Sequence, residues 1–204
     1  MPRPMGVRNH DFAEKREALL DCLCEFSLQA GLQRPSLRRF AKAADASEPT
    51  LRHYFSDRQG LVIAILECFG RRIRAARAGG EPAARLADLI ERQLSGSLNG
   101  LRERSEIRAH AFGLVEGLSD PAVGEAYLEH VLEPSLGAIA DGLAGGEPAK
   151  RPRSALRAAS LSVLAPLLLM VIHQDLLGGK PRWSFDESHT LEQIRNGLSA
   201  GLET

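Results

Sequence analysis

Polar side chains suited to nucleic-acid binding are concentrated between residues 36 and 55. The segment reads Ser36-Leu-Arg-Arg-Phe-Ala-Lys-Ala-Ala-Asp-Ala-Ser-Glu-Pro-Thr-Leu-Arg-His-Tyr-Phe55. Arginine can hold guanine through two hydrogen bonds, and hydroxyl groups near a helix N-terminus can bind phosphate. The second half of the segment offers short polar groups, one long cation and two aromatic groups with polar tips: Glu48, Pro49, Thr50, Arg52, His53 and Tyr54. These types predict contacts to phosphates and base edges in a major groove.

Patterns for catalysis or metal binding are missing from the sequence. It has no nucleophile elbow, glycine-rich phosphate loop, His-Glu-x-x-His motif or paired-cysteine zinc pattern. The cysteines are Cys22, Cys24 and Cys68, an odd number that argues against a disulfide framework. Cys22 and Cys24 lie two apart on a predicted helix and so face different ways, which favours buried structural thiols over a metal site. We therefore expect no enzyme activity, no cofactor and no metal.

The helices that carry this segment can be predicted from periodicity and capping. A first helix is expected over about residues 11–30, because Asp11 and Glu14 have capping-box spacing and Gly31 can end it. One face of that helix is apolar: Leu19, Cys22, Leu23, Phe26 and Ala30.

Two shorter helices follow, separated by a tight turn. Ser36 can cap the first, which runs to about Ala44 with Leu37, Phe40 and Ala41 on its apolar side. Asp45-Ala46 forms the turn, since Asp tolerates the left-handed conformation. Ser47 caps the second, with Pro49 in its first turn and Leu51 and Phe55 facing inward.

A fourth helix is expected over about residues 57–78. Ser56 and Gln59 have capping-box spacing, which would open it at Asp57, and Gly79-Gly80 would end it. Its inward stripe is Leu61, Ile65 and Phe69.

Two short helices around a tight turn, after a longer helix, form a helix-turn-helix pattern. Three short amphipathic helices can equally form a plain bundle. The segment resembles the DNA-binding part of the TetR (tetracycline-repressor-like) family through Ser36, Phe40, Ala41, Ala44, Ser47, Thr50, Leu51, Tyr54, Phe55 and Leu61. The resemblance covers about residues 11–70. It departs from the family where Asp45 replaces the usual turn glycine, Arg52 a common Tyr and Arg58 a common Lys.

The resemblance implies DNA contacts from Arg38, Thr50, Tyr54 and Arg58. Of the arginines, Arg38 and Arg52 are the best candidates for reading bases. Thr50, His53, Tyr54 and Arg58 are interpreted as phosphate contacts. Glu48 can accept a hydrogen bond from cytosine or remain solvated. With the cap Ser47 and Pro49, these residues make up the predicted DNA-binding set.

Charge is balanced overall but not along the chain. The formal net charge is zero, yet residues 1–80 carry 14 Lys and Arg against 9 Asp and Glu, and residues 81–204 carry 12 against 17. A basic front and an acidic rear indicate that the front meets a polyanion. The start has no signal-peptide pattern, and the apolar run 161–172 is shorter than a membrane span. We therefore expect a cytoplasmic protein with no membrane partner.

The rear of the chain also reads as helices separated by Gly and Pro. Helices are expected from Pro82 to about Leu98, over 102–117, from Asp120-Pro121 onward, over 152–177 and over 187–202, with 142–151 and 180–185 as connections. Residues 161–172 are apolar nearly all round, so that helix should be buried on several sides, with a kink or free carbonyl at Pro166. We expect it and the last helix to form a homodimer.

In the family, the rear helices form a pocket for a small molecule. Candidate effector contacts are His110, Phe112, Glu116, Tyr127, His130, Met170 and His173, although each alone suits a core position equally well. Because polar candidates are sparse and the helices are aliphatic, the predicted effector is largely apolar.

The fold expected is all-α. An N-terminal three-helix helix-turn-helix DNA-binding domain covers 1–58, and a helical effector-binding and dimerisation domain covers 59–204, with the helix at 57–78 joining them. The function expected is a dimeric transcriptional repressor that the effector releases from a palindromic operator in double-stranded DNA. Two alternatives stay open: a DNA-binding regulator that responds to a protein partner or to nothing, and a helical enzyme or interaction module that shares only the fold.

Overall fold

The computed structural model describes residues 5–29, 33–77, 85–102, 106–145 and 151–202. Within these ranges the chain is helical and contains no β-strand, as expected for an all-α protein. It divides into two compact units, which we describe separately. Unit 1 comprises residues 1–72 and 108–131, and unit 2 comprises residues 73–107 and 132–204. The functional boundary expected near residue 58 stays a prediction.

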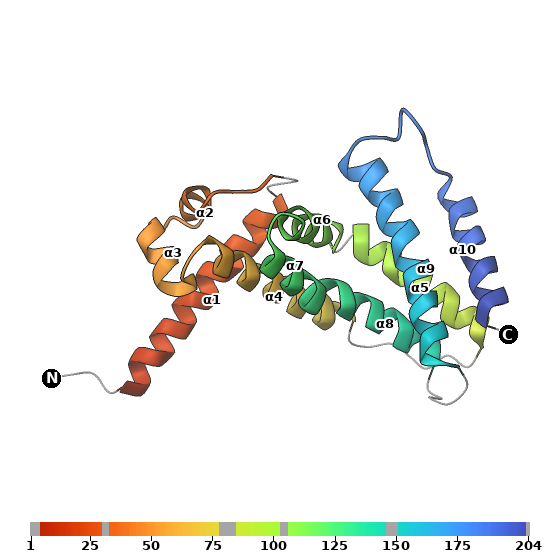
Figure 1. Ribbon diagram of the computed structural model, residues 1–204, viewed down its shortest axis with the longest axis horizontal. Coiled ribbons are helices and arrows are strands. Elements are labelled where there is room, and N and C mark those ends of the chain that lie inside the picture. The colour runs from red at the N-terminus through yellow and green to blue at the C-terminus, as the bar shows by residue number, and fades with distance from the viewer. Residues whose placement is uncertain (1–4, 30–32, 78–84, 103–105, 146–150, 203–204) are drawn as a thin grey trace. The chain divides into compact units, whose positions relative to one another are not determined.

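Unit 1 contains the predicted helix-turn-helix segment. Its helices are α1 (Met5–Gln29), α2 (Leu37–Ala43), α3 (Glu48–Phe55), most of α4 (Arg58–Arg77), most of α6 (Glu106–Gly117) and α7 (Pro121–Tyr127), followed by a π-helical turn, η1 (Leu128–Leu132) (Figure 1). Leu20, Phe40, Leu51, Ile65 and Phe112 are among its fully or almost fully buried side chains. The stripes predicted for α3 and α4 are therefore confirmed.

The described ends of these helices follow the predicted capping residues with two exceptions, at the starts of α1 and α4. Ser36 and Ser47 cap α2 and α3 as predicted, and Asp120 caps α7 by accepting from the backbone N–H groups of Ala122 and Val123. The first helix begins at Met5 instead of Asp11, so the capping box predicted at Asp11 and Glu14 is wrong. The stops predicted at Gly31 and Gly79-Gly80, and the start at Pro82, lie outside the described residues.

Asp57, not Ser56, caps the start of α4. The Asp57 carboxylate accepts from the backbone N–H of Gly60 at 2.8 Å, whereas Ser56 is the residue that ends α3. The inward position predicted for Cys22 is also wrong, because its side chain is exposed while Cys24 and Cys68 are buried. The buried face of α1 is formed instead by Leu20, Leu23 and Cys24.

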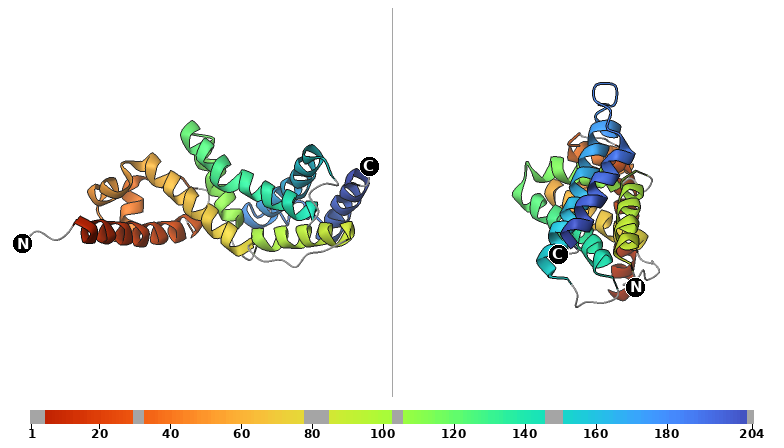
Figure 2. Two further views of the ribbon diagram at one scale, coloured as in Figure 1. Left: turned by 90° about the horizontal axis from the view of Figure 1, so that it is seen from below. Right: turned by 90° about the vertical axis from the view of Figure 1, so that its right-hand side faces the viewer.

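Unit 2 is a helical bundle with an aliphatic core. It contains α5 (Leu86–Arg102), α8 (Glu133–Ala144), α9 (Arg153–Val171), the π-helical turn η2 (Ile172–Leu176) and α10 (Glu187–Leu202). The last two predicted helices are thus confirmed, with Gly178 at φ 65° just after η2. Helices α9 and α10 run side by side and both pack against α5 (Figures 1 and 2). Ile90, Leu94, Leu167 and Val171 lie at the centre of the core.

From Ala158 onward, one side of α9 is buried and the other is exposed and uncharged, whereas Arg153 and Arg157 are exposed in its first turns. Val163, Leu164 and Leu167 are buried, but Leu161 is 56 % exposed and Leu169 is 64 % exposed. The segment Arg153–Leu176 is long and apolar enough, by length and composition, to cross a membrane. Its buried side nevertheless packs in the unit 2 core, as in the central helix of a bundle.

Candidate nucleic-acid interface

The turn between α2 and α3 has a backbone geometry that few residues adopt. Asp45 has φ 48°, in the left-handed region where Asp is tolerated, so the prediction for this turn is confirmed. The backbone N–H of Ala46 donates to the carbonyl of Ala41 at 2.9 Å and closes the turn. The turn therefore keeps a fixed geometry although it lacks the glycine usual in the resembled family.

Ser47 caps the N-terminus of α3 with its side chain. The Ser47 hydroxyl accepts from the backbone N–H of Thr50 at 3.1 Å and shares a hydrogen bond with the Thr50 hydroxyl at 2.8 Å. Pro49 occupies the first turn, where its missing N–H leaves no hydrogen bond unmade. The backbone N–H groups of this first turn give the outer end of α3 a positive character that attracts anions.

The predicted contact residues lie on the outer side of the helix-turn-helix. Leu51 and Phe55 are buried in unit 1, while Pro49, Arg52 and His53 are exposed and Glu48, Thr50 and Tyr54 are half-buried. Arg38 is exposed on α2. Two further cations that the sequence reasoning left out, Arg39 and Lys42, are also exposed on α2. Their spacing on the outer face of a capped helix was the signal that could have found them.

An aromatic cluster joins α1 to α3. The ring of Phe12 on α1 lies 4.7 Å from the ring of Tyr54 and 5.4 Å from that of His53, measured between centroids. His53 and Tyr54 contact each other edge to face at 5.0 Å. Phe12 was missed because it lies in a part of α1 with no apolar periodicity. The cluster restricts the rotamers of two predicted phosphate contacts.

The connection between α3 and α4 is a strained, tight turn. Ser56 has φ 69° and ψ −62°, and the backbone N–H of Asp57 donates to the carbonyl of Phe55 at 2.9 Å. This is a γ-turn with positive φ, a conformation that is rare and strained. A Cβ atom built on Gly60 would lie 2.3 Å from the Phe55 carbonyl oxygen, so glycine is required there.

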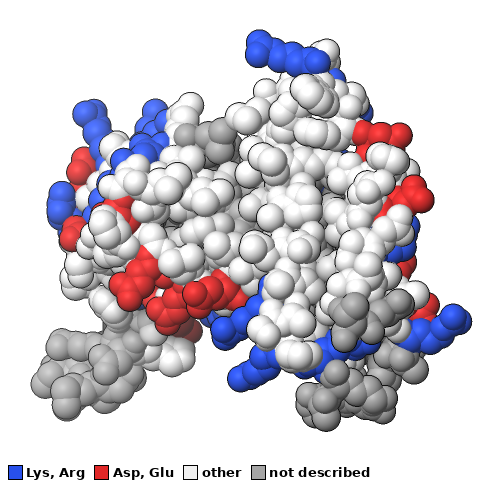
Figure 3. Space-filling view, turned by 45° about the vertical axis from the view of Figure 1, so that its right-hand side comes forward, with Lys and Arg blue, Asp and Glu red and all other residues white. Residues whose placement is uncertain are grey.

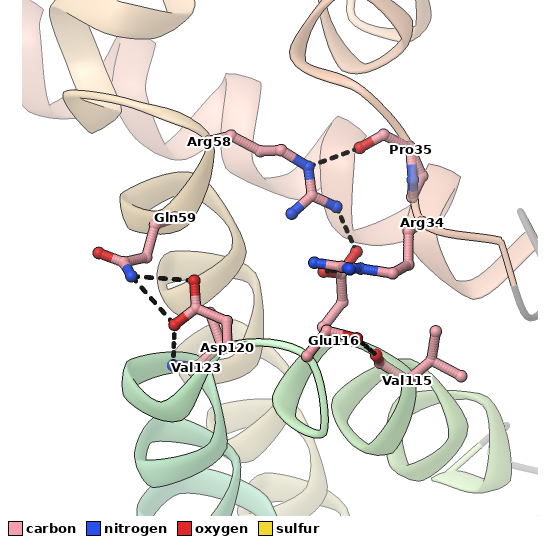
Figure 4. Close-up of polar contacts among 9 residues, drawn as sticks. Arg34, Pro35, Arg58, Gln59, Val115, Glu116, Asp120 and Val123 are labelled. Atoms are coloured by element: carbon pink, nitrogen blue, oxygen red, sulfur yellow. Dashed lines mark hydrogen bonds and ion pairs between the residues drawn. The ribbon is translucent and has the colours of Figure 1, made fainter.

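Arg58, a predicted phosphate contact, is held within unit 1 by a carboxylate. Its Nη2 atom lies 2.5 Å from Oε1 of Glu116, and its Nε donates to the carbonyl of Pro35 at 2.8 Å (Figure 4). Arg34 reaches the other oxygen of Glu116 at 3.1 Å. The Glu116 side chain is only 1 % exposed, so water cannot stabilise its charge. The two arginines provide that stabilisation instead. A predicted DNA contact and a predicted effector contact are thus partners of each other.

A second polar contact lies beside this ion pair. The Gln59 amide donates to both carboxylate oxygens of Asp120 at 3.0 Å (Figure 4). The hydrogen bond from Gln59 and those from the backbone of α7 hold the pKa of Asp120 below its usual range. The start of α4 is therefore tied to the end of α6 and the start of α7.

Of the other effector candidates in unit 1, His110, Phe112 and Tyr127 are buried in its interior, and His130 is half-buried. Tyr127 shares a 2.9 Å hydrogen bond with Nδ1 of His110, which is fully buried. Burial raises the pKa of Tyr127 above its usual range. Phe112 packs edge to face on Phe69. His130 lies 3.9 Å from Glu67, measured from Nε2 to the nearer carboxylate oxygen.

The two remaining candidates belong to unit 2. Met170 is part of the aliphatic core, and His173 packs edge to face against Phe185 at 5.1 Å. The candidates therefore divide between the units. Inside unit 1, His110 and Tyr127 of the predicted effector set contact each other, and Glu116 contacts Arg58 of the DNA-binding set.

A shallow cavity of about 380 Å³ lies between α9 and α10. Small residues from both helices line much of it: Ala155, Ala158, Ala159, Ser162, Gly197 and Gly201. None of the predicted effector contacts is among its described lining residues. Uncharged side chains predominate over the middle of the face that Figure 3 turns toward the viewer.

The fold and site define an all-α chain with a helix-turn-helix at its front. No family model matches the sequence. No curated protein matches it closely enough to count as a relative.

Solved structures with a similar fold include two proteins described as TetR-family regulators of transcription. A Rhodococcus sp. protein assigned to the TetR family of transcriptional regulators is 21% identical, with a TM-score of 0.62, over 93% of this chain and 97% of that one. A TetR transcriptional regulator from Rhodococcus sp. RHA1 is 21% identical with a TM-score of 0.56, over 93% and 96%. GusR from Salmonella enterica is 19% identical with a TM-score of 0.58, over 93% and 95%. The chain has the fold of TetR-family transcriptional regulators along almost its whole length.

Proposed function

We propose that this protein is a TetR-family transcriptional regulator that binds double-stranded operator DNA. The observation that carries the proposal is α3, whose capped N-terminus and outer side chains are presented away from a well-packed inner side. The fold shared with the Rhodococcus regulators supports it. A DNA-binding role assigns the protein to the compartment that holds the DNA, which we take to be the cytoplasm.

The contacts are assigned by side-chain chemistry and exposure. Arg38 and Arg52 are exposed and can read guanine, whereas Ser47, Thr50, His53 and Tyr54 hold phosphates. Glu48 and Pro49 lie at the groove beside them. Arg58 differs from the rest, because a phosphate must first displace the Glu116 carboxylate from its guanidinium.

The test is DNA binding by matched single variants. The DNA is the sequence that the unsubstituted protein protects from nuclease digestion. Arg38→Ala and Arg52→Ala should each weaken binding to it by about 1–3 kcal/mol and relax the base preference at one position of the site. Lys180→Ala, in the α9–α10 connection of unit 2, serves as a control that removes an exposed cation elsewhere. Unchanged affinity and preference in both arginine variants would show that α2 and α3 do not read bases.

We also propose a homodimer formed by α9 and α10. Leu161, Leu169 and Ala165 form an exposed, uncharged stripe on α9, and small residues of α10 lie beside it. Exposed apolar surface of this kind favours an interface, because burying it removes it from water. Two copies related by a two-fold axis would present two α3 helices to two half-sites of a palindrome.

Light scattering tests the dimer with a matched pair of substitutions. Leu169→Arg should give monomers, because a cation would then face the partner's apolar stripe. Leu118→Arg places the same charge at an 86 % exposed leucine of unit 1 and should leave the dimer intact. A dimer that survives Leu169→Arg and the deletion of residues 187–204 would exclude this interface.

For the effector we propose a largely apolar small molecule bound among the rear helices. The aliphatic character of the unit 2 core and the internal pairing of Glu116 leave few charged groups to hold a multiply charged ligand. DNA release and thermal-shift assays with apolar compounds and with phosphorylated metabolites distinguish the classes. Release by charged metabolites alone would overturn this proposal, and DNA binding without any effector response would favour the constitutive or protein-responsive alternative.

A further inference from the structure

Two buried cysteines meet between α1 and α4 in unit 1. Cys24 is fully buried on α1, and Cys68 is 2 % exposed on α4. Each thiol shifts the pKa of the other, upward for Cys24 and downward for Cys68, as expected for neighbouring side chains. The two side chains therefore lie next to each other although they are 44 positions apart in the chain.

Ion pairs on both sides fix the register in which α1 and α4 meet. Arg72, one turn after Cys68, binds Glu25 at 2.5 Å and Asp21 at 3.1 Å, and these two residues flank Cys24 on α1. Arg71 binds Glu17 at 2.8 Å one turn earlier on α1. Because three carboxylates of α1 hold two consecutive arginines of α4, the helices cannot slide without breaking these contacts. The cysteines are thus held opposite each other.

The surroundings make the two thiols unequal. The pKa of the Cys68 thiol is below its usual range, because the hydrogen bond from Cys24 stabilises its thiolate and the nearby guanidinium of Arg72 adds to this. The pKa of Cys24 is raised by the same hydrogen bond and by burial. A thiolate beside a protonated thiol is the arrangement in which one sulfur attacks an oxidant and the other resolves the product.

We propose that Cys24 and Cys68 form a peroxide-sensitive dithiol that closes to a disulfide between α1 and α4. The Cys68 thiolate attacks one oxygen of a hydroperoxide, the O–O bond breaks, and Cys68 becomes a sulfenic acid while the leaving oxygen departs as water or an alcohol. The Cys24 sulfur then attacks the sulfenic sulfur, its proton goes to the departing oxygen, and water leaves. Overall, two thiols and one hydroperoxide give a disulfide, water and the second hydroxyl product, and thiol reductants reverse the change.

Cys22 is the built-in control for this proposal. Its thiol is exposed and donates to the carbonyl of Ala43 at 3.5 Å, on a different face of α1 from Cys24. If accessibility alone decided oxidation, Cys22 would react first. If the paired geometry decides it, Cys24 and Cys68 are lost together while Cys22 stays a thiol.

The experiment is hydrogen peroxide treatment of the full-length, pre-reduced protein, followed by thiol counting after denaturation and by peptide mapping. Free thiols should fall from three to one per chain, and return to three with reductant. Trypsin, which does not cut before Pro35, should release residues 17–38 joined to residues 59–71. Because the first peptide holds both Cys22 and Cys24, the Cys22→Ser variant must give the same cross-link.

Single variants separate the two steps. In Cys24→Ser, dimedone should trap the sulfenic acid at Cys68, and no cross-linked peptide should form. A cross-link through Cys22, a disulfide between two chains, or oxidation of Cys22 while Cys24 and Cys68 stay reduced would each overturn the proposal. If a cysteine variant fails to fold, fragmentation of the cross-linked peptide from the alkylated, unsubstituted protein shows whether Cys22 or Cys24 carries the free thiol, and so decides the matter.

Discussion

Buried polar pairs join the helices of unit 1, whereas the long-range ion pairs of unit 2 lie at its surface. In unit 1, Glu116 is almost inaccessible between two arginines, and His110 shares a buried hydrogen bond with Tyr127. In unit 2, Arg195 meets Glu91 with both side chains more than a third exposed, and the interior is aliphatic. Directional contacts specify one arrangement of partners, while aliphatic packing tolerates several. The helices around the helix-turn-helix are therefore the more strictly specified part.

The largest effect should come from the aliphatic core of unit 2. Leu167→Ala removes a fully buried side chain and should lower the free energy of unfolding by about 2–5 kcal/mol, measured by urea denaturation. Leu118→Ala, at an 86 % exposed position, should change it by less than about 0.5 kcal/mol. Equal effects of the two would mean that the packing of α9 in this core is incorrect.

Arg58→Met should lower the free energy of unfolding by about 2–4 kcal/mol, because Glu116 keeps only Arg34 as a partner. Adding Glu116→Gln should recover part of the loss, since the remaining buried group is then neutral. Urea denaturation of the two single variants and the double variant gives the coupling energy, expected at about 0.5–3 kcal/mol. Strict additivity would contradict the ion pair in Figure 4.

Tyr127→Phe should cost about 1–2 kcal/mol, because Nδ1 of His110 loses its partner in a buried site. The effect should depend on pH. Burial raises the pKa of Tyr127 in the folded state, so the unfolded chain releases this proton first, above a pH of about 10. The contribution of Tyr127 therefore declines as the pH rises further. The difference in stability between the two proteins should shrink there, and a constant difference would argue against the burial of this phenol.

Arg195→Gln should have the smallest effect, about 0.5 kcal/mol or less, because the Glu91 pair is exposed and water screens it. Added salt should remove most of that difference but leave the effect of Arg58→Met in place. Chemical denaturation at low and high ionic strength measures both. If added salt reduced the effects of both substitutions equally, the ion pair of unit 1 would be no better shielded from solvent than that of unit 2.

The capped and periodic elements were predictable from sequence because their signals are local. Ser47, Pro49 and Leu51 lie within one turn of α3, and the last helix was placed at residues 187–202 by the Gly and Pro around it. The Asp45 turn was predicted for the same reason. Local signals fail at Ser56, whose positive φ belongs to a γ-turn closed by the hydrogen bond from Asp57 to Phe55, although Ser is not a residue type that favours this conformation.

Pairings between distant residues could not be predicted. Arg58 and Glu116 are 58 positions apart, and each alone has the properties of a surface charge. The pairing of Cys24 with Cys68 was unpredictable for the same reason. Cys22 is nearer to Cys24 in the sequence, but its side chain is exposed. Periodicity can say that a side chain faces inward, but only the packing of helices selects its partner.

The γ-turn at Ser56 also fixes the length of the chain between two helices. Only Ser56 and Asp57 separate the end of α3 from the start of α4, and the hydrogen bond from Asp57 to Phe55 leaves no slack between them. Successive residues of an α-helix are rotated by about 100° around its axis. If one residue inserted here were taken up into the end of α3, the earlier residues of α3 would turn by more than a quarter of a circle relative to α4 and present a different row of side chains outward. Substitutions on the outer side of α3 leave the direction of its side chains unchanged, whereas a change of one residue in the length of this turn alters it.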